Sequence, residues 1–125
     1  MNLDFLRAHC LRLPHATEHI QWGDDLIFKI AGKMFAGAPL SPARIALSFK
    51  CAPEEFAELV ERPGVIPAPY MARVYWVALE KHDALPAAEI KRRLTRSYEL
   101  VFAKLPKKTQ LELSRTAPAA KGRRR

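Results

Sequence analysis

The chain has 125 residues, of which 49% are hydrophobic, and it carries a formal net charge of +8. This length suits one globular domain with a single core, the composition excludes an intrinsically disordered chain, and no apolar run approaches the roughly 20 residues of a membrane-spanning helix. The N-terminal segment MNLDFLRAHC includes an early Asp4 and no long apolar stretch, so we expect no secretory signal and a cytoplasmic protein.

The first element is predicted to be a helix over residues 2–13, because apolar side chains recur there at spacings of three and four residues. Asn2 suits the N-cap position, and Pro14 ends the helix. Residues 17–22 are predicted to form a strand of low hydrophobicity near the edge of a sheet, followed by a turn at residues 23–25.

The next stretch, residues 26–50, reads LIFKIAGKMFAGAPLSPARIALSFK and holds three short apolar runs divided by turn residues. Hydrophobic residues alternate with other residues in the first and third runs, a pattern that predicts an antiparallel meander with one buried and one wetter face. The residues expected on the buried face are Leu26, Phe28, Ile30, Ile45, Leu47 and Phe49. The rest of the chain is expected to cover that face.

A second helix is predicted from Pro53, because the missing N–H of proline is tolerated in a first helical turn. After it, Pro67 and Pro69 are expected to prevent regular structure. Residues 72–80 are rich in β-branched and aromatic side chains and are predicted to form a fifth strand.

A long third helix is predicted over residues 86–104, and residues 107–113 are expected to add one more turn. Its inner stripe is expected to contain Ile90, Leu94, Ser97 or Tyr98, Val101 and Leu105, and its outer side Arg92, Arg93 and Arg96. The fold class is therefore α+β, with an antiparallel sheet of about five strands packed against helices in the order α-β-β-β-β-α-β-α.

The positive charge is unevenly distributed along the chain. The segment SRTAPAAKGRRR, residues 114–125, carries five basic residues and no acid, which leaves 16 basic and 13 acidic residues in the body. We therefore expect one α+β domain over residues 1–113 and a basic, flexible tail over residues 114–125.

No residue pattern indicates an enzyme. Cys10 and Cys51 lie far apart, without a CxxC motif or a histidine at metal-ligand spacing, and are expected to be buried, reduced thiols. The histidines are scattered, and no nucleophile motif, phosphate-binding glycine loop or HExxH motif occurs. The sequence predicts no catalytic residue, no metal site and no cofactor.

The sheet face opposite the predicted core offers a candidate binding surface. Lys29, Ser48 and Lys50 are expected to share it, and lysine and arginine side chains neutralise backbone phosphates. Among the nearby aromatic residues, Trp76 is expected in the core beside Val74 and Ala78, whereas Tyr70 is the better candidate for an exposed, base-stacking ring. The candidate nucleic-acid-binding residues are Lys29, Lys33, Lys50, Tyr70, Arg73, Tyr75, Arg123, Arg124 and Arg125.

Two functional interpretations stay open on the residues alone. One is a DNA-binding domain that contacts backbone phosphates through its sheet face, loops and basic tail. The other is a protein-interaction module, either a monomer or a homodimer, that uses the same face as an apolar or peptide-binding surface. A plain solvated sheet face, with lysines that discourage strand pairing, would also fit this pattern.

Five stretches of the chain resemble, in order and spacing, the MmcQ/YjbR family of small bacterial proteins. They are LRLPHATE, WGDDLIFKIAGKMFA, LSFKCAPEEF, PGVIPAPYMARVYW and LTRSYELVFAKLPKK, which together cover roughly residues 6–108. The most specific match is PGVIP at residues 63–67, followed by Tyr70, Met71 and Trp76.

The resemblance implies an α+β sandwich similar to frataxin and to secretion chaperones, and a DNA-binding protein with a double-wing motif. The family usually has a polar or basic cluster between the methionine and the tryptophan, and here only Arg73 is clearly kept. If that loop touches phosphate, this chain has fewer donors for it. Iron binding of the frataxin kind depends on an acidic first helix, in which this chain has only Asp4, so no metal is expected.

Overall fold

The computed structural model describes residues 2–115. Its elements, in chain order, are α1 (Leu3–Cys10), β1 (Ala16–Gln21), β2 (Asp25–Ile30), β3 (Lys33–Pro39), β4 (Leu47–Lys50), α2 (Pro53–Leu59), β5 (Val65–Pro67), the 3-10 helix η1 (Ala72–Val74), β6 (Trp76–Leu79), α3 (Ala87–Ala103) and α4 (Lys107–Arg115).

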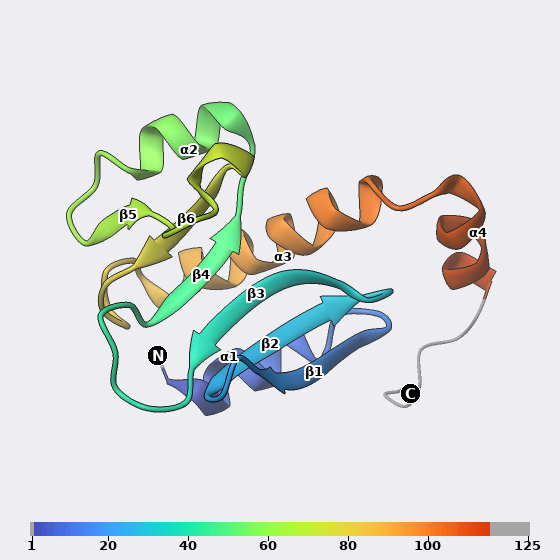
Figure 1. Cartoon of the computed structure of the whole chain (residues 1–125). Coiled ribbons are helices and arrows are strands. Elements are labelled where there is room, and N and C mark those ends of the chain that lie inside the picture. The colour runs from blue at the N-terminus through green and yellow to red at the C-terminus, as the bar shows by residue number, and fades with distance from the viewer. Residues whose placement is uncertain (1, 116–125) are drawn as a thin grey trace.

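The strands form one open antiparallel sheet in the order β1-β2-β3-β4-β6-β5. Helices α1 and α3 lie behind this sheet in Figure 1, and α3 packs across β2, β3 and β4. The opposite face, turned toward the viewer, carries no helix over its centre (Figure 1). The α+β class is therefore confirmed, with six strands in the described residues where about five were predicted.

The main core lies between the sheet and helices α1 and α3. The predicted inner stripe of α3 is confirmed, since Ile90, Leu94, Ser97, Tyr98, Val101 and Leu105 are all buried. They meet Leu26, Phe28, Ile30, Leu47 and Phe49 from the strands, as the alternation predicted. Both cysteines are buried, free thiols in this core, which confirms their predicted burial.

The first helix and the first strand differ from the sequence-based expectation only at their ends. Asn2 caps α1 by accepting a 2.9 Å hydrogen bond from the N–H of Phe5, but the helix ends at Cys10. Strand β1 forms an edge of the sheet, as predicted, and pairs only with β2 among the described strands.

Two predictions for the segment after α2 were wrong. Val65–Pro67 forms the short strand β5 despite its proline, because an edge strand has unpaired backbone positions and tolerates proline at its end. Residues 72–80 are not one strand: η1 occupies the first part, Tyr75 adopts left-handed backbone angles, and only Trp76–Leu79 pairs with β4. As a result Val74 is exposed, and the predicted alternation with Trp76 does not hold.

The alternation in the meander also failed at two positions. Ile45 precedes β4 and packs beside Trp76 and Ala78 on the open side of the sheet, not in the main core. Ile27 was expected on the wetter face and is 2% exposed there. Both sides of the sheet therefore bury apolar side chains, and the open face has a small hydrophobic cluster of its own.

Helix α4 confirms the expected helical turn after Pro106 and continues to Arg115. The predicted tail otherwise lies outside the described residues, as do Arg123, Arg124 and Arg125. No helix between residues 2 and 115 has the length and apolar character required to cross a membrane.

Candidate functional site

The open face of the sheet is built on a row of paired residues that crosses five strands. Ile27 pairs with Gly37, Gly37 with Ser48, and Ser48 with Ala78, which pairs with Ile66. Side chains of residues paired in this way point to the same face of a sheet. Because the three central members are small, the face is hollow along its middle.

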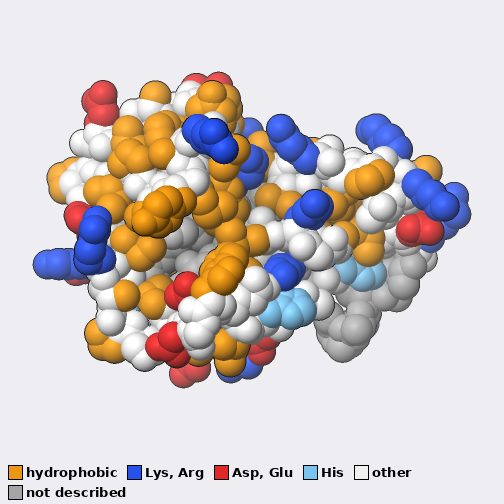
Figure 2. Space-filling view, in the orientation of Figure 1, with side chains coloured by type: hydrophobic (Ala, Val, Ile, Leu, Met, Phe, Trp, Pro, Cys, Tyr) orange, Lys and Arg blue, Asp and Glu red, His pale blue; other side chains and the backbone are white. Residues whose placement is uncertain are grey.

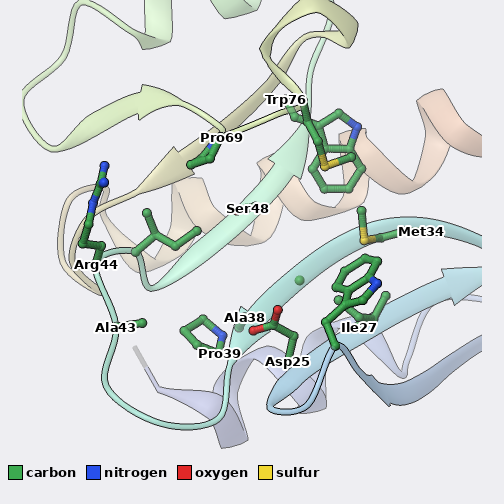
Figure 3. Close-up of a pocket in the computed structure, with 14 residues that line it drawn as sticks. Asp25, Ile27, Met34, Ala38, Pro39, Ala43, Arg44, Ser48, Pro69 and Trp76 are labelled. Atoms are coloured by element: carbon green, nitrogen blue, oxygen red, sulfur yellow. The ribbon is translucent and has the colours of Figure 1, made fainter.

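This hollow is a groove of about 350 Å³. Ile27, Met34 and Ser48 lie along its floor, and Trp22 and Trp76 line it with their aromatic rings. Figure 3 shows Met34 and Ile27 on one side, Trp76 and Pro69 on the other, and the carboxylate of Asp25 extending toward the cavity. In the space-filling view, hydrophobic side chains surround a hollow in the middle of this face (Figure 2).

The glycine in the row keeps the groove open. A Cβ atom on Gly37 would lie 3.1 Å from Cδ1 of Ile27 and 4.0 Å from Sδ of Met34. A larger residue at this position would therefore displace Ile27 or fill the groove. Glycine carries no Cβ and leaves both the space and the packing of Ile27 intact.

Three exposed aromatic residues near the groove have backbone angles that side chains rarely adopt. The φ angles are +52° at Trp22, +66° at Tyr70 and +65° at Tyr75. Such angles cost about 1–3 kcal/mol for residues other than glycine and concentrate at functional sites. Trp22 is 69% exposed and Tyr70 is fully exposed, which confirms the prediction of an exposed ring at Tyr70.

Tyr75 differs from the other two rings because it has a partner. Its ring meets that of Phe56 on α2 edge to face, with centroids 5.8 Å apart. This contact holds η1 against α2 and leaves the Tyr75 ring only 40% exposed. Tyr75 therefore anchors the loop that presents Arg73 and Tyr70.

The basic candidates lie at one end of the groove. Lys29 pairs with Met34, and Lys50 pairs with Trp76, so the two lysines flank the groove on the open face, as predicted. Strand β3 lies between the strands that carry them, and its pairing with β4 ends at Ala36–Phe49, before Lys50. Lys33 follows the two-residue turn between β2 and β3 and is exposed.

Lys50 is held in position by the neighbouring loop. Its Nζ donates a 3.0 Å hydrogen bond to the carbonyl oxygen of Val74, next to the exposed Arg73. Partial burial, together with the charge of Lys104 at the end of α3, lowers the pKa of Lys50 below its ordinary value. We call Lys29, Lys50, Arg73 and Lys104 the basic rim.

Ion pairs elsewhere in the domain leave the basic rim without acidic partners. Glu18 pairs with an arginine on α1, and Glu55 and Glu89 pair with arginines on α3 and just after α2. Within residues 2–115, no carboxylate lies within 4.0 Å of a rim cation. In Figure 2, lysine and arginine side chains are spread over the part of this face beside the groove, and acidic side chains lie mostly at its other margins. The rim cations are therefore available to an external anion.

The described residues contain no arrangement that indicates catalysis. No group of three histidine, cysteine or acidic side chains between residues 2 and 115 could hold a metal ion. Burial raises the pKa of Cys10 to about 12 and that of Cys51 to about 11, so neither thiol ionises readily to the nucleophilic thiolate. The ring nitrogen Nε2 of His9 lies 2.9 Å from the hydroxyl of Thr95, and that of His19 lies 2.9 Å from the hydroxyl of Thr17.

Sequence reasoning identified the basic rim more completely than the groove beside it. It placed Lys29, Ser48, Lys50 and Arg73 near one surface but did not single out Trp22, Ile27, Met34 or Asp25. A signal was present in the run WGDDLI, where a tryptophan precedes a turn glycine and Ile27 breaks the alternation of apolar and polar residues.

Comparisons with known proteins place the fold among solved relatives. A family model described as YjbR matches residues 11–100. The crystal structure of Deinococcus radiodurans protein DR2400, a protein with a DUF419 domain, is 30% identical to this chain, has a TM-score of 0.82, and is matched over 90% of this chain and 88% of that one.

A second solved structure supports the fold alone. A protein from Pseudomonas syringae is 22% identical, with a TM-score of 0.66, and is matched over 80% of this chain and 98% of that one. No curated protein matches this chain.

Proposed function

This chain belongs to the YjbR family, and from that premise we propose that it is a non-enzymatic, cytoplasmic domain that binds nucleic acid by contacting backbone phosphates with its basic rim. The observation that carries the proposal is a set of cations without carboxylate partners, at one end of the open sheet face. Within residues 2–115, Arg7, Arg62, Arg93 and Arg96 pair with glutamates, whereas none of the rim cations does.

The geometry of the rim suits a phosphate chain better than a single anion. Lys29 lies on β2, Lys50 lies on β4, and Arg73 lies in the loop that Lys50 contacts, so the charges follow one another across the open face. Cations in a line neutralise successive phosphates and release their counterions. Contacts of this kind fix position on the nucleic acid without reading its sequence, so we expect sequence-tolerant binding.

A salt titration tests the proposal. Binding of the full chain to labelled DNA is measured by fluorescence anisotropy at several salt concentrations, and the logarithm of the affinity is plotted against the logarithm of salt. Lys29→Ala and Arg73→Ala should each weaken binding and reduce the slope on duplex DNA by about 0.9 unit, the loss of one phosphate contact.

Lys81→Ala is the matched control, because Lys81 is an exposed lysine on the segment after β6, at the opposite end of the sheet. Its substitution should leave the slope unchanged. Equal effects of all three substitutions would show that net charge, rather than the rim, drives binding. Absence of binding at low salt would reject the proposal.

A second candidate function is a protein-interaction module that forms a homodimer. Large apolar side chains are exposed on the described surface near the sheet edge and the groove, at Ile20, Trp22, Leu40, Tyr70 and Val74. Exposed apolar surface of this kind is typical of interfaces. Sedimentation equilibrium over a range of concentrations tests this candidate, since a homodimer has twice the mass of the 14.2 kDa monomer.

A further inference from the structure

We infer that the groove on the open face holds one unstacked base of a single-stranded nucleic acid, while the basic rim holds the adjoining phosphates; this inference rests on the proposed function. The groove has about 350 Å³ of space, and two tryptophans line it. Bases stack on aromatic side chains in sites that bind single strands. A base inside a duplex could not enter, because it is stacked and paired.

The groove and the basic rim lie next to each other, which favours a nucleotide as the ligand. Met34 and Trp76 line the groove, and they are the strand partners of Lys29 and Lys50. The apolar space and the cations therefore adjoin, as a base and its phosphate do. A purely apolar partner would leave the rim cations without a counter-charge on binding.

Asp25 supplies a polar contact at the other end of the groove. It lines the cavity, and its carboxylate extends toward it in Figure 3, whereas the Arg44 side chain extends away. A carboxylate only accepts hydrogen bonds and pairs well with the exocyclic amino group of cytosine. We therefore expect Asp25 to favour cytosine over thymine in the groove.

The backbone at Trp22 adds an independent argument. The ring is exposed and the φ angle is in the left-handed region, so tryptophan at this position costs folding free energy and gains little burial. Asparagine tolerates the same backbone angles. Trp22→Asn should therefore leave the midpoint of urea unfolding unchanged or raise it, while a residue kept for packing would lower it.

The experiment compares three labelled DNA probes with the full chain at one salt concentration: a deoxycytidine oligonucleotide, a deoxythymidine oligonucleotide of the same length, and a duplex of that length. Single strands should bind more tightly than the duplex and quench tryptophan fluorescence. Trp22→Asn should weaken single-strand binding roughly 5- to 150-fold, the range that corresponds to about 1–3 kcal/mol of stacking per base.

Two further variants and a control complete the design. Ser48→Leu fills the groove floor and should reduce single-strand binding toward the duplex value, and Asp25→Asn should reduce the preference for the cytidine probe. Ile20→Ala is the control, because Ile20 is an exposed apolar residue that pairs with Leu26 and therefore faces the helix side of the sheet.

The outcomes separate this inference from the function on which it rests. Equal binding of single strands and duplex, unaffected by Trp22→Asn and Ser48→Leu, would overturn the base site and leave the phosphate-binding proposal standing. Failure of every probe to bind at low salt would overturn both. A dimer that Ser48→Leu dissociates, with single-strand binding unchanged, would assign the groove to a second copy of the chain and overturn the base site.

Discussion

The hydroxyl of Ser97, fully buried on α3, donates a 2.6 Å hydrogen bond to the carbonyl oxygen of Phe35 on β3. The hydroxyl oxygen of Ser97 itself accepts a 2.9 Å hydrogen bond from the N–H of Lys50 at the end of β4. Pairing between β3 and β4 extends only from Gly37–Ser48 to Ala36–Phe49, so Ser97 bridges the two strands where their own ladder stops. One helix side chain thus sets the position of a basic-rim residue.

Ser97→Ala should lower the free energy of unfolding by about 2–4 kcal/mol. The substitution removes the partner of a buried carbonyl and of a partly buried N–H, and a buried unsatisfied group costs about 1–3 kcal/mol. Urea unfolding monitored by circular dichroism measures the loss. Ser114→Ala is the matched control, since the Ser114 hydroxyl bonds to Gln110 on the exposed surface of α4, and it should change stability by less than about 0.5 kcal/mol. A loss at Ser97 no larger than at Ser114 would contradict the bridging role.

Leu94→Ala should lower the free energy of unfolding by about 2–5 kcal/mol, because Leu94 is fully buried between α3 and the sheet and its truncation leaves a cavity. The same urea experiment measures the change. Leu111→Ala on α4 serves as the control, since Leu111 is exposed and its loss should cost little. Equal losses of unfolding free energy for the two variants would contradict the burial of Leu94 between α3 and the sheet.

Protonation of Glu89 at acidic pH should lower the free energy of unfolding. Its carboxylate accepts hydrogen bonds from Arg62 at 2.6 Å and from Arg93 at 3.0 Å, and the bond from Arg62 is the main cause that lowers the pKa of Glu89 below 4.5. A carboxyl whose folded-state pKa is depressed contributes stability above its unfolded pKa, and this contribution is lost as the pH falls through the folded value. Unfolding free energies should therefore drop below about pH 4.5.

Glu89→Gln should remove this part of the pH dependence. The difference in unfolding free energy between the wild type and the variant should be largest near neutral pH and should shrink below about pH 4.5. Glu58→Gln is the control, because Glu58 is exposed on α2 and makes no ion pair among the described residues. A difference that stays constant with pH would show that Glu89 acts by packing and not by charge.

Deleting residues 116–125 should flatten the salt dependence of DNA binding without abolishing binding at low salt. The deleted segment carries four basic residues, namely Lys121, Arg123, Arg124 and Arg125. Each phosphate contact contributes close to one unit of slope on duplex DNA, so the slope should fall by up to about four units. The anisotropy titration measures it. Complete loss of binding would mean that the folded domain has no phosphate site of its own.

Local periodicity in the sequence was sufficient to predict the buried residues of the elements that pack on one side only. The stripe on α3 repeats at helical spacing, and every member of it is buried, because a helix that covers a sheet must present one continuous apolar face. Tyr70 could be recognised as exposed, because Pro67 and Pro69 just before it leave it outside regular structure.

The predictions failed where a neighbouring strand, rather than the local residue pattern, decided the conformation. Pro67 was predicted to prevent regular structure. The short strand β5 nevertheless pairs with β6, because proline is tolerated at the end of an edge strand. Ile45 follows the alternation of β4 but precedes its first paired residue, so its side chain is free to cover Trp76 on the other face.

The α+β class, the family, the helix stripes and the basic residues of the open face follow from the sequence alone, because they depend on periodicity and composition along the chain. The groove exists only in the folded protein. Its floor is a row of Gly37, Ser48 and Ala78, small residues that are far apart in sequence and adjacent only after the strands pair. Its aromatic lining joins Trp22, between β1 and β2, to Trp76 at the start of β6, and strand order across the sheet, which no local pattern encodes, brings them together.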